Sequence, residues 1–204
     1  MKKILCSIFI IIISVWLVSC TTPPPSNPNN ICNVFEQYPS WYWAAKATRH
    51  KYGVPISVQM AIIHQESHFR ADAKPPKKYL LWIIPWGHVT SAYGYSQATD
   101  GTWAHYIQQT GRKNVSRSNF SDASDFIGWY SVRAHKKLWI SKRNAYALYL
   151  AYHEGIAGYK NRSYRKKAWL MNVARKVQSR ADMYYSQLIH CEKNLPEQHW
   201  WHIW

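Results

Sequence analysis

One glutamate stands where a carboxylate is costly. Residues 55–69 repeat apolar side chains at helical spacing, and Val58, Ile62 and Glu66 follow one another at intervals of four, so Glu66 lies on the apolar face near the helix end. An apolar wall and the carbonyl-rich helix end both disfavour the ionised carboxylate, and we expect a raised pKa. A carboxylic acid that stays protonated near neutral pH can cleave a glycosidic bond by general acid catalysis. The alternative is a paired or snorkelling surface glutamate.

Three other residues could take part in chemistry. His64 and His68 lie four apart, as two metal ligands on one helix would. Their order, His-Gln-Glu-Ser-His, is not that of zinc proteases, and no third ligand is evident, so we expect no metal and no other cofactor. Glu154 could be a second carboxylate that activates water; we favour a local turn or cleft residue.

The elements that must position these residues are mainly helical. Apolar residues recur mostly at helical spacing, and no long alternating pattern indicates a strand. Ser121 is the expected N-cap of the fourth helix, and Gly111 is the expected stop of the third. Tyr184 falls on the apolar face of the last helix and should point inward. The expected helices cover residues 40–52, 55–68, 100–110, 122–139, 143–152 and 168–190.

Two segments depart from the helical pattern. Prolines 75, 76 and 85 prevent a continuous helix between residues 72 and 93, where we expect a loop or hairpin that folds over the domain. Residues 193–204 form an aromatic C-terminal tail that ends in HWWHIW. Two interpretations of this tail stay open, a surface contact with membrane or glycan and a disordered terminus.

The first residues have the layout of a secretory signal. Lys2 and Lys3 precede an apolar run over residues 4–18, which is short for an uncleaved membrane anchor, the alternative. Residues 17–20, Leu-Val-Ser-Cys, resemble the lipobox of bacterial lipoproteins. The resemblance implies a signal peptide over 1–19, a lipid on Cys20 and, because Thr21 follows rather than Asp, anchorage at the periplasmic face of the outer membrane.

The segment after the lipobox is expected to be a tether. Residues 20–38 include the Pro- and Asn-rich stretch TTPPPSNPNN, and the folded domain is expected over residues 39–192. Once Cys6 leaves with the signal and Cys20 carries lipid, Cys32 and Cys191 remain near the two ends of the domain. An oxidising compartment permits a disulfide between them, and two buried free thiols are the alternative.

Three short motifs occur in a recognisable order. They are Glu66-Ser67, then Gly94-Tyr95-Ser96-Gln97, then Ala-Tyr-His-Glu-Gly at 151–155, with Trp103 after the second. These motifs resemble the Glu-Ser, Gly-Leu-Met-Gln and Ala-Tyr-Asn-x-Gly motifs of the soluble lytic transglycosylase family, over roughly residues 41–188. The resemblance implies a mostly helical, goose-lysozyme-like (SLT) fold.

The same resemblance implies a reaction on peptidoglycan glycan strands. Glu66 would protonate the oxygen of the β-1,4 bond between N-acetylmuramic acid and N-acetylglucosamine, then take a proton from the C6 hydroxyl, which attacks C1 and leaves a 1,6-anhydromuramyl end. Tyr184 resembles the tyrosine that hydrogen-bonds the catalytic glutamate; Tyr152 and Tyr184 could instead be plain core residues. The positions that would bind or support substrate are Ser67, Gly94, Tyr95, Gln97, Tyr152 and His153.

The sequence departs from the family pattern at three places. Tyr95-Ser96 replace Leu-Met, His153 replaces Asn, and the 74–92 insertion lengthens the chain between the first two motifs. These differences indicate a divergent branch with a modified cleft roof. A muramidase on the same fold is the alternative enzyme. A silent wall-binding lipoprotein is the alternative from another class, against which the intact Glu66 argues.

The overall charge and the aromatic content limit the kinds of partner that we expect the protein to bind. The chain of 204 residues has 26 Lys and Arg against 10 Asp and Glu, a net charge of +16, and 16% aromatic residues. So many aromatic residues exclude a disordered basic tail, whereas nucleic acid, membrane and polysaccharide all suit the charge. Export would exclude nucleic acid. We therefore expect a monomer whose partners are peptidoglycan and, through Cys20, a membrane.

Overall fold

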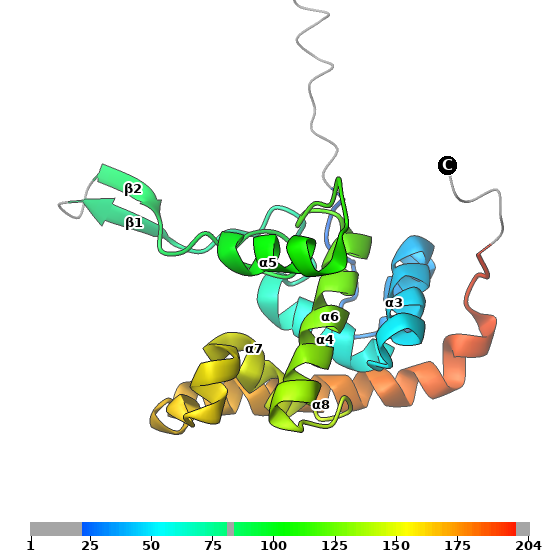
Figure 1. Ribbon diagram of the computed structural model, residues 1–204. Helices are drawn as coiled ribbons and strands as arrows, with labels where there is room; N and C mark the ends of the chain where they lie inside the picture. The colour runs from blue at the N-terminus through cyan, green and yellow to red at the C-terminus, as the bar shows by residue number, and fades with distance from the viewer. Residues whose placement is uncertain (1–21, 81–83, 199–204) are drawn as a thin grey trace, which may run out of the picture.

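The computed structural model describes residues 22–80 and 84–198, and it confirms a mainly helical fold with a small hairpin (Figure 1). All six expected helices are present, with one additional helix near the N-terminus. In chain order the elements are α2 (Ile31–Gln37), α3 (Pro39–Tyr52), α4 (Ile56–Ser67), β1 (Lys77–Leu80), β2 (Ile84–His88), α5 (Asp100–Thr110), α6 (Phe120–Leu138), α7 (Ala145–Lys160), the 3-10 turn η1 (Ser163–Lys166), α8 (Ala168–Cys191) and the 3-10 turn η2 (Glu192–Asn194).

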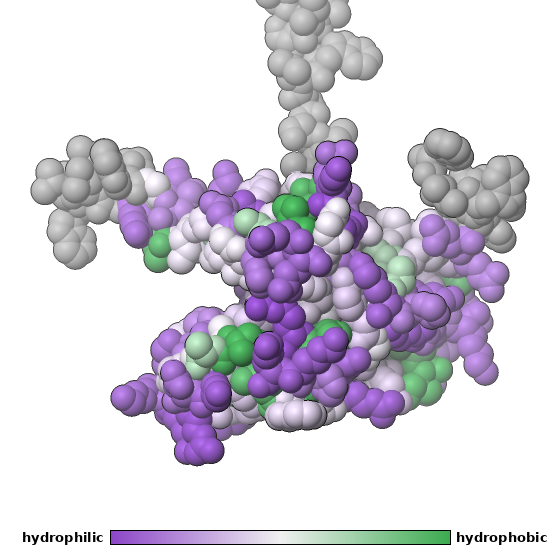
Figure 2. Space-filling model, viewed as in Figure 1, coloured by the Kyte–Doolittle hydropathy of each residue, from purple (hydrophilic) through white to green (hydrophobic). Residues whose placement is uncertain are grey.

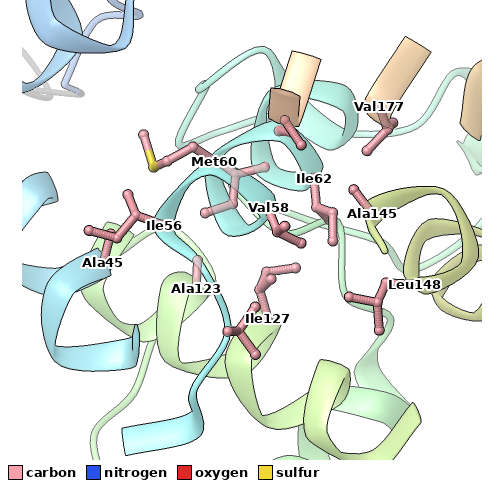
Figure 3. Packing of buried hydrophobic residues seen from close by; sticks show 14 of the residues in the cluster. Ala45, Ile56, Val58, Met60, Ile62, Ala123, Ile127, Ala145, Leu148 and Val177 are labelled. Carbon is pink, nitrogen blue, oxygen red and sulfur yellow. The ribbon is translucent and has the colours of Figure 1, made fainter. Parts of the chain in front are cut away.

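Helix α4 forms the centre of the core. Every residue of α4 except Gln65 and Glu66 is buried. Figure 3 shows its side chains among residues of the surrounding helices, with Ile62 near Val177 of α8. A helix that is apolar on all sides is stable only when other elements cover it, so α4 organises the packing of α3, α6, α7 and α8 around it.

Two details fix how α3, α4 and α6 approach one another. The buried Gln59 amide donates to the carbonyls of Ala45 at 3.2 Å and Val54 at 2.8 Å, and its oxygen accepts from Ser124 at 2.9 Å. All of its polar groups are thereby satisfied within the core. At Gly128 of α6, an added Cβ would lie 2.5 Å from the Thr48 side chain, so this glycine permits close packing of α3 on α6.

The ends of α5 and α6 show whether the predicted cap residues are correct. Gly111 caps α5 with φ 67°, as expected. The expected N-cap Ser121 is wrong: α6 begins at Phe120, and the Asn119 side chain accepts from the Asp122 N–H at 3.1 Å. Asn119 has extended backbone angles and caps as well as serine does, which moves the start two residues upstream.

The last two helices run side by side. The buried face of α8 is the predicted one and consists of Leu170, Ala174, Val177, Ala181, Tyr184 and Leu188. Helix α7 continues to Lys160, beyond the expected end at 152, but Gly155 interrupts it with φ 74° and ψ 166°. The break lies within the third motif and changes the direction of the chain there.

The insertion forms an antiparallel hairpin, with Lys77 opposite His88 and Leu80 opposite Ile84. A hairpin was one of the expected forms, but the expectation that it folds over the domain is wrong. Figure 1 shows β1 and β2 projecting away from the helical body beyond α5. The two strands pair with each other and make few contacts with the helices, which leaves them free to extend outward.

The segment before α3 belongs to the folded domain, which differs from the tether expected over residues 20–38. Ile31, Val34 and Phe35 of α2 are fully buried. Upstream of α2, the Pro23 carbonyl accepts from the Tyr38 hydroxyl at 2.9 Å, and Ser26 donates its N–H to Gln37 at 3.0 Å. The predicted signal peptide and Cys20 lie outside the described residues.

The C-terminal tail is partly described. Leu195 is buried, and the Pro196 carbonyl accepts from the Trp43 indole at 2.7 Å, so the start of the tail packs on the domain. Residues 199–204, with HWWHIW, lie outside the described residues. Across the described ranges, none of the helices combines the length and apolar character needed to span a membrane.

The predicted disulfide is confirmed. Cys32 of α2 and Cys191 at the end of α8 are bonded, with 6.1 Å between their Cα atoms and 159 residues between them in sequence. Closing so long a loop restricts the unfolded chain strongly. The bond therefore fastens the first described helix to the last.

We predict that replacing both cysteines (Cys32→Ser with Cys191→Ser) lowers the free energy of unfolding by about 2–5 kcal/mol, because the unfolded chain regains its loop entropy. Urea titration of the wild type and the double variant measures the change. Reductant should lower the wild-type midpoint to that of the variant and leave the variant unchanged. Equal midpoints for both proteins without reductant would contradict the prediction.

Candidate active site

A pocket of about 330 Å³ opens beside the end of α4. The loop before α5 forms one side of the pocket, and the end of α7 forms the other side. Figure 2 shows that the surface is indented between α5 and α7. The lining residues of the pocket come from all three sequence motifs and from α5 and α6. They are Glu66, Gln97, Ala98, Thr99, Thr102, Phe126, Tyr130, Tyr152, His153, Glu154 and Gly155.

Glu66 lies in the last turn of α4, and its side chain lines the pocket. The helix ends at Ser67 and is capped by His68, whose backbone is left-handed. The Glu66 side chain is only partly exposed, and burial raises the pKa of the carboxyl to about 8. The expected upward direction is confirmed. A hydrogen bond from Tyr149 favours the ionised form and opposes the rise, but burial is the larger effect. Glu66 is therefore protonated at neutral pH and can donate a proton into the pocket.

Tyr149 was not among the predicted site residues. It lies on α7 three positions before Tyr152, so both tyrosines face the same side of that helix. This spacing is the signal that could have identified it. Burial and the neighbouring Glu66 both raise the pKa of the Tyr149 hydroxyl, which keeps it a hydrogen-bond donor.

The structure gives Tyr184 a different partner from the expected one. The side chain is fully buried, as predicted, but its hydroxyl donates to the Pro28 carbonyl and accepts from Arg180 at 3.3 Å. Tyr184 thus fixes the N-terminal segment to α8, and Tyr149 occupies the place beside Glu66 that was expected for it. The physical reason is that the buried face of α8 at this level contacts the segment before α2.

Tyr152 joins the third motif to the second. Its hydroxyl donates to the Ser96 carbonyl at 2.5 Å, and its ring meets the Tyr130 ring edge to face at 4.9 Å. Burial raises the pKa of Tyr152 well above its usual range, so it stays neutral. The Tyr152 ring is therefore a fixed wall of the pocket.

The second motif holds the loop together more than it contacts the pocket. Gly94 has φ 73°, and an added Cβ would lie 2.1 Å from the Arg117 carbonyl, so only glycine fits. Gln97 lines the pocket, and its amide nitrogen donates to the carbonyls of Ala73 at 2.8 Å and Gly94 at 2.9 Å. Within the described residues the Gln97 side-chain oxygen accepts no hydrogen bond, so it can accept one from a ligand.

Two further predicted residues do not line the pocket. Tyr95 is buried and packs on Trp41 and Phe120, with ring centroids 5.5 Å and 5.3 Å away. Ser67 is buried and donates its hydroxyl to the Ile63 carbonyl at 3.1 Å within α4. The structure therefore brings Glu66, Gln97, Tyr152 and His153 together, and it places Ser67, Gly94, Tyr95 and Tyr184 in supporting positions.

Glu154 is a second carboxylate on the pocket wall, but its oxygens are occupied. Lys167 donates to it at 2.7 Å, the Ser163 hydroxyl donates to it, and His153 lies 3.1 Å away. Burial alone would raise the pKa of Glu154, but these donors outweigh it and lower the pKa to about 2. Glu154 is therefore ionised and held in place, in contrast to Glu66.

The environment of His64, in α4, and of His68, the C-cap residue of that helix, differs from that of a metal site. Burial, together with the charges of Arg180 and His68, lowers the pKa of His64 to about 4, so His64 is neutral at pH 7. The rings of His64 and His68 lie 4.9 Å apart. Within residues 22–80 and 84–198, no group of three His, Cys, Asp or Glu side chains is arranged to hold a metal ion.

A carboxyl that burial keeps protonated beside a pocket is the group that general acid cleavage of a glycosidic bond needs. The comparison with protein families matches residues 8–191 to the transglycosylase SLT domain. The chain therefore belongs to that family, which implies a transglycosylase that binds and cleaves peptidoglycan. The comparisons with curated proteins and with solved structures gave no match.

The Tyr149 hydrogen bond gives a testable pH dependence. Activity that needs protonated Glu66 should fall as the pH rises through about 8. Tyr149→Phe removes a bond that favours ionised Glu66, so the pKa rises and the alkaline limb of kcat/KM moves up by about one pH unit. Tyr146→Phe, on the same helix, is the matched control and should leave the limb in place. An unmoved limb in Tyr149→Phe would count against this contact.

Proposed function

We propose that the protein is a lytic transglycosylase that cleaves the β-1,4 bond between N-acetylmuramic acid and N-acetylglucosamine in peptidoglycan, and leaves a 1,6-anhydromuramyl end. The observation that carries the proposal is the contrast between the two pocket carboxyls. Glu66 is protonated at neutral pH, whereas Glu154 is ionised and bound by three donors. Formation of an anhydro ring needs one carboxyl that acts twice, and Glu66 has the properties for it.

In the first step, the Glu66 proton passes to the glycosidic oxygen as the bond from that oxygen to C1 of the muramic acid breaks. Glu66 becomes a carboxylate, which the Tyr149 hydrogen bond stabilises. In the second step, the carboxylate takes the proton of the C6 hydroxyl while the C6 oxygen bonds to C1. Glu66 ends protonated, no water is consumed, and the rings of Tyr152 and Tyr130 position the sugar.

A muramidase would use the same pocket differently. Glu154 would have to activate a water molecule from a wall where Lys167 and Ser163 already bind its oxygens. A carboxylate with its proton-accepting positions taken and a pKa of about 2 is a poor base. The contacts of Glu154 therefore favour the transglycosylase reaction.

We predict that Glu66→Gln lowers the rate of product release from purified peptidoglycan by at least about a hundredfold, because the amide cannot donate the proton. Mass spectrometry of the soluble products of the mature domain measures it. Glu154→Gln is the matched control, and its products should still be anhydromuropeptides. Products with reducing ends that disappear in Glu154→Gln would support the muramidase. Wall binding without products from the wild type would support a silent binder.

We propose that the enzyme is anchored by a lipid on Cys20 to the periplasmic face of the outer membrane. The basic start, the apolar run over 4–18 and the lipobox-like residues 17–20 support this. The net charge is +16 for the whole chain and +14 without Lys2 and Lys3, which would leave with the signal, and this charge suits adhesion to the anionic wall and membrane surfaces. The proposal includes a monomer with no nucleic-acid partner.

We predict that Cys20→Ala moves the protein from the outer-membrane fraction to the soluble or inner-membrane fraction, because the lipid can no longer be attached. Fractionation on a density gradient with labelled fatty acid measures it. Cys6→Ala, within the predicted signal, is the control and should keep both the lipid and the location. Wild-type protein without fatty-acid label that keeps its first 19 residues would indicate an uncleaved anchor instead.

A further inference from the structure

An exposed tryptophan adjoins the catalytic pocket. Trp169, the second residue of α8, is 56% exposed. Its ring meets the His153 ring edge to face, with 5.3 Å between the centroids. His153 lines the pocket that contains Glu66. We call His153 and Trp169 the aromatic shelf, because the two rings are in contact and His153 belongs to the pocket wall.

The two helices that carry the shelf are tied to each other beside it. Glu154, next to His153, binds Lys167 at 2.7 Å, and Lys167 is the N-cap of α8. The Ser163 hydroxyl also donates to Glu154, and η1 packs against both helices. Figure 1 shows the end of α7 beside the start of α8. A surface that is fixed before the ligand arrives binds without an ordering cost.

The surroundings of the shelf are basic. Lys167 balances the charge of the ionised Glu154, and residues 160–166 contain no acidic side chain but four basic ones, Lys160, Arg162, Arg165 and Lys166. Figure 2 shows the tip formed by these residues as strongly hydrophilic. An aromatic ring in a positive field suits a ligand that combines an apolar ring face with carboxylates.

We propose that the aromatic shelf binds a sugar ring of the glycan strand beyond the two rings joined by the bond that Glu66 breaks, with the basic tip favouring strands that carry carboxylates. The inference rests on the proposed function. One face of a pyranose ring presents C–H groups that pack against an aromatic ring, while its hydroxyls and substituents remain polar. Such a position would hold long strands and add nothing to the binding of a fragment too short to reach it.

The test compares Trp169→Ala with Trp139→Ala. Trp139 is 88% exposed at the end of α6 and does not line the pocket, so it is a matched control. We expect Trp169→Ala to raise the KM for long peptidoglycan strands by about tenfold, a typical loss for a stacked ring, with no effect on the KM for a MurNAc–GlcNAc disaccharide, which contains the cleaved bond and no further ring. Trp169→Phe, which keeps a flat ring, should recover most of the affinity, and Trp139→Ala should match the wild type.

Two results would overturn the shelf: an unchanged KM for long strands in Trp169→Ala, or an equal loss in Trp139→Ala. Binding of neutral N-acetylglucosamine oligomers to the wild type as tightly as wall strands of the same length would overturn the role of the basic tip. Failure of the proposed function is a separate outcome, because it shows as absence of anhydro products from the wild type. In that case the same variants are compared by binding of labelled glycan strands, with the same expected loss.

Discussion

The central physical constraint in this structure is the burial of the Glu66 carboxyl group away from water. Glu66 ends a helix that is otherwise almost wholly buried, so its acidity is set by the packing of α3, α6, α7 and α8 around α4. The same packing that supplies the hydrophobic free energy of folding also creates the environment that keeps the acid protonated. The acidity of Glu66 and the packing of the core are therefore properties of one arrangement, and neither can change far without the other.

The three motifs divide into residues that meet the pocket and residues that hold its walls. Gly94 permits a backbone contact that any side chain would block, and Gln97 ties that loop to Ala73 while it lines the pocket. Tyr152 then fastens the loop to α7 through the Ser96 carbonyl. A motif in this fold thus determines the distance between two walls as much as it supplies the groups that line the pocket.

The sequence predicted what depends on spacing along one element. The i, i+4 position of Glu66 indicated its raised pKa, and the face of α8 followed from its periodicity. Contacts between elements were harder to predict. The choice of Tyr149 over Tyr184 depends on how α7 and α8 cross α4. The short helix α2 was hidden by its proline-rich neighbours, although Ile31, Val34 and Phe35 have the spacing of a buried helical face. The residues of the hairpin do not indicate whether it folds over the domain or extends away from it.

The bond between Cys32 and Cys191 also has a mechanical consequence. A pull on the chain upstream of Thr22 enters the domain through the segment before α2. Without the disulfide, that segment and α2 would be held by hydrogen bonds and by the buried side chains of Ile31, Val34 and Phe35, which can separate one contact at a time. Because α2 is covalently joined to the end of α8, the load passes instead to the longest helix, which packs along the core. The domain can therefore bear tension at its N-terminal end.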